Sequence, residues 1–92
     1  MIVIAGHSFT KREKRDATVV ALSDMVARAR KQDGCFDLSI SPDSVDPERI
    51  NVFECWRDER SWKAWRRIAK PPRVTLRDPQ VRLFRCNEAE EL

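Results

Sequence analysis

Two strand-like runs, separated by a short loop, constrain the fold of this chain more than any other feature. In CFDLSIS at residues 35–41, Phe36, Leu38 and Ile40 alternate with smaller or polar residues, as in a strand with one buried face. The next segment, PDSVDPER, carries two prolines with aspartates and serines in turn-forming positions. A second run, INVFECW at residues 50–56, follows it. The pattern predicts a long antiparallel hairpin.

A helix is predicted before this hairpin, at about residues 12–32. Apolar residues recur on one face at helical spacing: Val19, Leu22, Met25, Val26 and Ala29. The segment TKRE, which begins at Thr10, has the form of a capping box for the start of the helix. Asp24 and Arg28 can pair one turn apart, and Gly34 is placed to end the helix in a left-handed conformation.

The remaining elements are a strand on each side and a shorter helix. The run IVIAGHSF at residues 2–9 is typical of an opening strand, because it is rich in β-branched residues. Asp58 can cap a helix that continues to about Ala69, and the Pro71-Pro72 pair stops it. Val81, Leu83 and Arg85 then alternate with Arg82, Phe84 and Cys86 in a last strand. The acidic end, residues 87–92, is expected to fray.

The order of these elements is strand, helix, strand, strand, helix, strand. This order predicts a ferredoxin-like α+β fold, in which two helices cover one face of a four-stranded antiparallel sheet. The chain has 92 residues, so the whole of it, residues 1–92, is expected to form one domain. A domain of this size buries only about 60–65% of the surface that its unfolded chain exposes, so association with a second copy would stabilise it.

The charge of the chain does not favour a nucleic-acid partner. Its 18 basic and 15 acidic residues give a net charge of +3 and mostly interleave. The basic clusters, Lys11–Arg15 and Arg66–Arg73, are short, and solvated helix ends are the favoured interpretation. A nucleic-acid-binding module of this fold would need a motif of exposed sheet aromatics, which Phe36, Phe53 and Phe84 do not form. No nucleic acid is therefore expected to bind.

The three cysteines, Cys35, Cys55 and Cys86, are too widely spaced to form a CxxC pair for zinc or redox chemistry. They are interpreted as small buried hydrophobic residues. MIVIAGHSF lacks the features of a secretory signal, and nothing approaches the roughly eighteen apolar residues of a membrane span. A cytoplasmic protein with no membrane partner is expected.

Several of these segments resemble the antibiotic biosynthesis monooxygenase family. They are IVIAGH, ARARKQDGC with FDLSIS after it, and above all DPERINVFECWRDERSWKAW. The resemblance covers roughly residues 1–67 and fades past Pro71. It implies a homodimer in which two ferredoxin-like sheets pack into a dimeric α/β barrel, with a pocket between each sheet and its helices.

The resemblance also implies an activity. Some members of the family oxidise phenolic or quinol-type aromatics with molecular oxygen, without metal or flavin, and others break down haem. We therefore expect a cofactor-independent monooxygenase that acts on a small aromatic substrate with O2. The alternative is a non-catalytic dimeric domain of the same fold that binds a small molecule. An oxygenase needs at least one acid-base or hydrogen-bonding side chain facing its substrate, and this separates the two hypotheses.

At the positions that form the family's pocket, this sequence carries only some of the family's usual residues. Trp56 matches a pocket tryptophan, but Val52 stands four residues before it, where oxygenase members carry asparagine. Asn51 is one place off, which in a strand means the opposite face. Trp65 stands where many relatives carry histidine, which weakens the case for haem degradation. The candidate substrate-binding residues are Val52, Phe53, Trp56 and Trp65.

The candidate catalytic residues are Trp56, His7 and Glu54, and no cofactor or metal ligand is expected. Glu54 shares a strand face with Trp56 and can act as a carboxylate base, although an ion pair with an arginine is the favoured alternative. His7 can supply acid-base chemistry if it points into the pocket, although a structural role is more common for a lone strand histidine. Trp62 and Trp65 are expected to be the packing face of the second helix.

Overall fold

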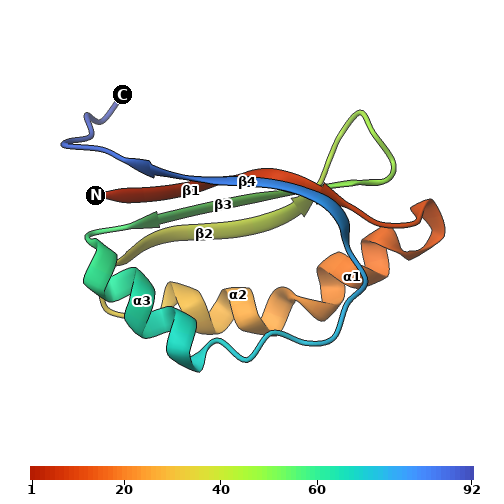
Figure 1. Cartoon of the computed structure of the whole chain (residues 1–92), viewed down its shortest axis with the longest axis horizontal. Helices are drawn as coiled ribbons and strands as arrows, with labels where there is room; N and C mark the ends of the chain where they lie inside the picture. The colour runs from red at the N-terminus through yellow and green to blue at the C-terminus, as the bar shows by residue number, and fades with distance from the viewer.

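The computed structural model describes all 92 residues and shows one antiparallel sheet with its helices on one side (Figure 1). The strands are β1 (Ile2–Phe9), β2 (Cys35–Pro42), β3 (Arg49–Trp56) and β4 (Arg77–Arg85). The helices are a 3-10 turn η1 (Arg12–Lys14), α1 (Arg15–Ala21), α2 (Ser23–Arg30) and α3 (Glu59–Ile68). The sheet has the order β2-β3-β1-β4. This is the ferredoxin-like α+β fold that the sequence predicts.

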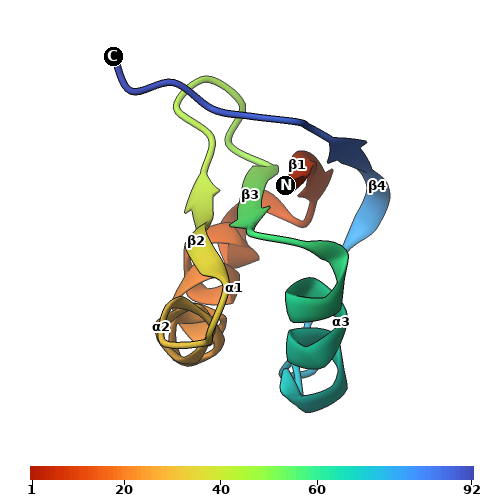
Figure 2. The same ribbon diagram turned by 90° about the vertical axis from the view of Figure 1, so that its left-hand side faces the viewer.

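The helices form a single layer under the sheet. In Figure 2, α2 lies below β2, and α3 lies on the other side of the molecule, towards β4. No helix covers the opposite face of the sheet, which we call the open face (Figure 1). None of the helices is long and apolar enough to span a membrane.

The hydrophobic core fills the space between the sheet and the helices. Its buried members come from every layer: Ile2, Ile4, Val26, Ala29, Leu38, Trp56, Trp65 and Ala69. Trp56 is completely buried, and it is the largest side chain with so little exposure. The predicted packing role of Trp65 is confirmed, and Trp62 packs against the same core with part of its surface exposed. Two tryptophans of the short helix α3 thus anchor it to the sheet.

The helix predicted at residues 12–32 forms in three pieces, the 3-10 turn η1 and the helices α1 and α2, and ends at Arg30. Leu22, Val26 and Ala29 of its apolar face are buried, and Val19 and Met25 are partly buried. The helices α1 and α2 are separated at Leu22, whose backbone stays in the helical region. The Ser23 hydroxyl donates a hydrogen bond of 2.6 Å to the Val20 carbonyl, one turn back. Such a bond competes with the regular backbone ladder, which gives a local physical reason for the interruption.

The predicted capping box at Thr10 is wrong. The first turn begins one residue later, at Lys11, and no side chain caps it. Thr10 is buried, and its backbone N–H donates to the carbonyl of Glu48 at 3.0 Å. The loop between β2 and β3 therefore holds Thr10 in place, directly after the end of β1, and Thr10 does not cap a helix.

The other predicted ends and pairs of the helices are confirmed. Asp58 caps α3, because its carboxylate accepts a hydrogen bond of 2.8 Å from the backbone N–H of Ser61. Asp24 and Arg28 form an ion pair of 3.0 Å on α2. Gly34 has a φ of +83°, the left-handed conformation predicted for the chain leaving the helix.

Candidate functional site

Strand β3 carries most of the candidate residues and divides them between the two faces of the sheet. In the register of β1 and β3, Trp56 pairs with Ile2, and Glu54 pairs with Ile4. These positions face the helices, as does Val52. Phe53 pairs with Ala5, one residue out of phase, and therefore lies on the open face.

Glu54 and Trp56 form the central contact of the candidate site. The indole Nε1–H of Trp56 donates a hydrogen bond of 3.0 Å to Oε1 of Glu54. The Trp56 ring stacks on Trp65 of α3, with 6.4 Å between the ring centroids and 23° between the planes. Stacking on Trp65 thus fixes the plane of the Trp56 ring, and the N–H at the edge of this ring orients the Glu54 carboxylate.

Burial raises the pKa of the Glu54 carboxyl above its ordinary value. The Trp56 hydrogen bond and the charge of Arg66 both act in the opposite direction, but burial is the larger effect. Glu54 forms no ion pair within the chain, because no basic nitrogen lies within 4.0 Å of its carboxylate. A carboxylate that is partly buried, oriented and not neutralised by a cation is suited to accept a proton.

Trp62 brings an unused hydrogen-bond donor to the same core. Its Nε1–H is buried and has no hydrogen-bond partner, which is uncommon for a buried polar group. The guanidinium of Arg66 lies over the Trp62 ring, 5.4 Å from its centroid. The sequence assigns Trp62 only a packing role. Its spacing of three residues from Trp65 places both rings on the inner side of α3, but only the structure reveals the free donor.

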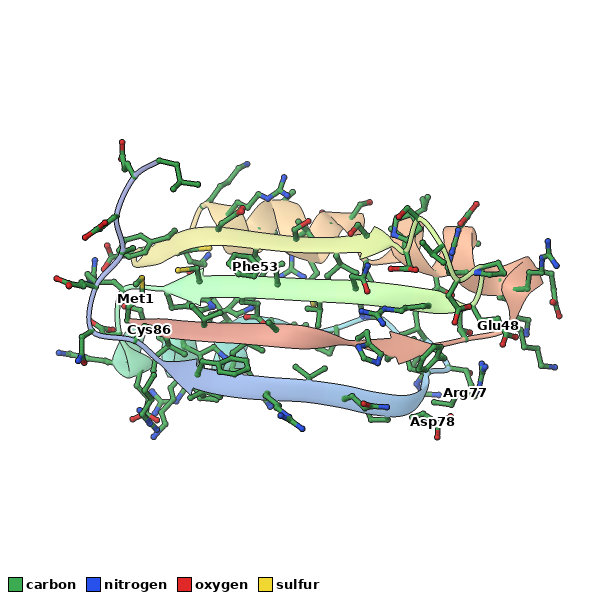
Figure 3. The ribbon with its side chains drawn as sticks, turned by 90° about the horizontal axis from the view of Figure 1, so that it is seen from above. Met1, Glu48, Phe53, Arg77, Asp78 and Cys86 are labelled. Carbon is green, nitrogen blue, oxygen red and sulfur yellow. The ribbon has the colours of Figure 1, made fainter.

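His7 and Phe53 lie away from the Glu54–Trp56 pair. His7 pairs with Asn51 and Gln80 across the sheet, which puts it on the open face. Its ring meets Phe9 edge to face, with 5.4 Å between the centroids. Phe53 is 40% exposed on this face (Figure 3). Within one chain, the structure therefore brings Glu54, Trp56 and Trp65 together and does not bring His7 or Phe53 to them.

Asn51 is out of phase with Trp56, as the strand pattern predicts, and its amide is already used. Its Nδ2 donates to Oδ1 of Asp43 at 2.9 Å, and its Oδ1 accepts from the Arg49 guanidinium at 2.7 Å. Asp43 also accepts the backbone N–H groups of Asp46 and Val45, and these bonds lower the pKa of its carboxyl to about 2. Asn51 therefore belongs to the structure of the β2–β3 loop.

The cysteines and acidic residues do not assemble a metal centre. No group of three or more His, Cys, Asp or Glu side chains is placed to hold a metal ion. The three cysteines are free thiols, each partly buried. Burial raises the pKa of the Cys35 and Cys55 thiols, which disfavours the reactive thiolate form.

Comparison with known proteins identifies the family. The sequence model of the antibiotic biosynthesis monooxygenase family matches residues 1–69, three quarters of the chain. The chain belongs to the antibiotic biosynthesis monooxygenase family. The resemblance predicted from the strand and tryptophan segments is therefore confirmed. No curated protein sequence matches the chain.

Solved structures share the fold. A proposed antibiotic biosynthesis monooxygenase of Deinococcus radiodurans superposes with a TM-score of 0.76 at 17% identity, covering 100% of this chain and 98% of that one. A proposed antibiotic biosynthesis monooxygenase of Nitrosomonas europaea gives a TM-score of 0.73 at 18% identity, with coverages of 94% and 98%. A conserved protein of Methanosarcina mazei gives 0.74 at 18% identity, with coverages of 94% and 92%. At such low identity these similarities establish the fold.

Proposed function

We propose that this protein is a cofactor-independent monooxygenase that oxidises a small phenol- or quinol-type aromatic with molecular oxygen. The observation that carries the proposal is the Glu54–Trp56 pair, a carboxylate with a raised pKa held by an indole N–H at the edge of an aromatic core. Family membership supports the reaction class. Glu54 is the proposed base, and Trp56, whose indole N–H holds the carboxylate, is the proposed positioning residue.

In the proposed reaction Glu54 removes a proton from a methylene carbon that phenolic rings activate, which leaves an electron-rich carbanion. The carbanion transfers an electron to O2, and the resulting radical and superoxide combine to a peroxide that takes its proton back from Glu54. Removal of the second methylene proton then expels water and leaves a ketone. The sum is CH2 + O2 → C=O + H2O, so the substrate supplies every electron and no separate reductant is needed.

Two features support a stabilised anion at this site. The low polarity of the tryptophan core strengthens any hydrogen bond to a developing oxyanion. The buried Nε1–H of Trp62 is a donor without a partner, and we assign it to the substrate oxygen.

We also propose that the open face packs against the open face of a second copy. Phe53 and Phe84 are 40% and 46% exposed there, and both come from adjacent parts of the same sheet surface with Val3 and Ala5. Figure 3 views this face, with Phe53 over its centre-left and no helix above it. A surface of exposed aromatics on a small domain is typical of an association site. The proposed assembly is the dimeric α/β barrel.

The test is oxygen uptake and product formation with a panel of anthrone-like and quinol substrates. Glu54→Gln keeps an acceptor for the Trp56 N–H but cannot take a proton, so we expect kcat to fall about 10²–10⁴-fold. Glu59→Gln is the matched control, because Glu59 is a carboxylate on the outer side of α3 that pairs with Arg85 at 2.8 Å. It should keep wild-type activity. The wild-type kcat/KM should fall at low pH as Glu54 becomes protonated.

Two outcomes contradict the proposal. No turnover of any substrate by a folded, dimeric protein counts against an oxygenase, and binding without turnover identifies a non-catalytic binding domain. Full activity in Glu54→Gln shows that another group removes the proton.

A further inference from the structure

The fold brings the end of the second basic cluster of the sequence beside the first. The first cluster, Lys11–Arg15, follows β1, and the second ends at Arg73 in the connection from α3 to β4. In Figure 1 this connection runs along the helices and rises beside α1 to reach β4. Lys14 and Arg73 line the same hollow, between α1 and this connection. Arg73 of the second cluster therefore lies beside Lys14 of the first, although about 60 residues separate the two in the chain.

Next to this hollow, at the end of β1, lies a cavity with a volume of about 230 Å³ that we call the basic cavity. Three cationic side chains line it, those of Lys11, Lys14 and Arg77. Phe9 and Leu76 give it an apolar wall, and Thr10 and Thr75 lie between the two kinds of surface. The cavity and the hollow share Lys14 and both threonines, so they form a continuous depression.

Two of the three positive charges of the basic cavity have no acidic partner; the third, that of Arg77, is paired with Glu48 and Asp78. No aspartate or glutamate lines it. Arg77 is held in place, because its guanidinium lies 2.8 Å from the Glu48 carboxylate (Figure 3) and 5.5 Å from the ring centroid of Phe9. Lys11 and Lys14 form no ion pair within the chain. Two ammonium groups are therefore free beside an immobilised guanidinium, which makes the cavity attractive to an anion.

The basic cavity is separate from the proposed oxidation site. Phe9 pairs with Arg49 at one end of β3, whereas Trp56 pairs with Ile2 at the other end. These seven residue steps along β1 correspond to roughly 23 Å. Neither Glu54 nor Trp56 lines the cavity.

We propose that the basic cavity binds a small organic anion, with one carboxylate or phosphate group on a single apolar ring. The acidic group would contact Lys11 and Lys14, and the ring would pack against Leu76 and the exposed part of Phe9. The cavity is smaller than the roughly 300–1,000 Å³ typical of drug-sized ligands, which favours a ligand of one ring. Extended nucleic acid is disfavoured, because Phe9 is the only aromatic residue of the cavity and Arg77 already covers its ring.

The proposal is tested by titrating the ¹⁵N-labelled protein with benzoate, phenyl phosphate, inorganic phosphate and benzyl alcohol. We expect benzoate or phenyl phosphate to shift the amide signals of residues 9–14 and 75–77, and benzyl alcohol, the neutral analogue, to shift them far less. The double variant Lys11→Glu, Lys14→Glu should weaken binding by about tenfold or more, because it replaces attraction by repulsion. Lys14→Met, which keeps the apolar stem without the charge, should weaken it less.

Lys63→Glu is the matched control, since Lys63 is an exposed lysine of α3 outside the cavity. It should bind the two organic anions as wild type does. The proposal is overturned if none of the probes shifts these amides, or if benzyl alcohol binds as well as benzoate. It is also overturned if inorganic phosphate binds as tightly as phenyl phosphate, which would leave no role for the apolar wall. A short RNA that binds more tightly than either anion, and is lost in the double variant, would identify a nucleic-acid surface instead.

Discussion

The two faces of the sheet differ although the same strands build both. On the covered face, Trp56 is completely buried and Glu54 lies beside it with a raised pKa. On the open face, Phe53 is 40% exposed, and the His7 ring meets the Phe9 ring edge to face. Neighbouring residues of β3 thus stand in a low-polarity core and on an accessible surface. Because successive residues of a strand point to opposite faces, the position of a side chain in β3 determines whether it can take part in catalysis or in association.

This difference separates catalysis from association in the proposed function. A proton acceptor is useful where water is excluded and its pKa is raised, which describes the covered face. Exposed aromatic rings are useful where a second surface can cover them, which describes the open face. Asn51 lies on the face of β3 opposite to Trp56. Its amide is hydrogen-bonded to Asp43 in the loop and does not reach the tryptophans.

The largest expected effect comes from removing the central ring of the covered face. Trp56→Ala should lower the free energy of unfolding by about 3–5 kcal/mol, because it leaves a cavity against Trp65 and unpairs Glu54. Phe36→Ala is the control, since Phe36 is a strand aromatic that is 62% exposed, and it should change stability by less than about 0.5 kcal/mol. Urea denaturation followed by far-ultraviolet circular dichroism, at one fixed protein concentration, measures both. Equal losses would show that Trp56 is not the core of the domain.

A smaller effect, with a definite pH dependence, is expected at Glu54. Because burial raises its pKa in the folded state, the folded protein holds this proton more tightly than the unfolded chain does. Stability therefore falls as pH rises from about 4.5 through the folded pKa, and stays reduced above it. Glu54→Gln removes the charge, so the variant should gain thermal stability over wild type at pH 7 and lose that gain at pH 4.

Glu59 is the matched control for this prediction, with the opposite sign. The hydrogen bond and charge of Arg85 lower the pKa of Glu59, so its ionised form stabilises the fold above its ordinary pKa. Glu59→Gln should lower Tm at pH 7, and this effect should shrink as the pH falls below about 4.5. Thermal unfolding at several pH values measures both variants. A Glu54→Gln protein less stable than wild type at pH 7 would show that the charged bond to Trp56 outweighs burial.

Sequence periodicity was sufficient to predict the elements and much of the core. Alternation placed Leu38 and Ile40 on the inner face, and helical spacing placed Val26 and Trp65 against the sheet. Phe36, predicted on the same face as Leu38, is instead 62% exposed, because the pairing of β2 with β3 shifts register between Cys35 and Asp37. The phase of Asn51 relative to Trp56 followed from the same rule, because both lie in one strand. The Glu54–Trp56 pair was predictable as a shared face, but its hydrogen bond and the raised pKa depend on three-dimensional packing.

What could not be predicted depended on segments distant in the chain. The face of His7 is set by the register of β1 against β3 and β4, which its own strand does not determine. Thr10 matches a capping motif, but its backbone N–H donates instead to a carbonyl of the β2–β3 loop. The basic cavity arises only because the connection before β4 passes beside α1, so its cations come from both ends of the chain.

Phe53→Ser is expected to change the free energy of unfolding of the monomer least. It is also the clearest test of the open face. Within one chain this exposed side chain contributes little, so monomer stability should change by about 0.5 kcal/mol or less. In the proposed dimer the ring would be covered by the partner, and its loss should weaken association by about tenfold or more. Sedimentation velocity over a dilution series measures this constant. Val20→Ser, on a residue of α1 that is 70% exposed, is the control and should leave it unchanged.

The result also separates the roles of the two faces. If Phe53→Ser yields a folded monomer that still oxidises substrate, the covered face is catalytically complete in one chain. If activity is lost with the dimer and returns at high protein concentration, the open face is needed to shape the site on its other side. A variant that dimerises like wild type would show that the exposed aromatics of this sheet are not the surface through which two copies associate.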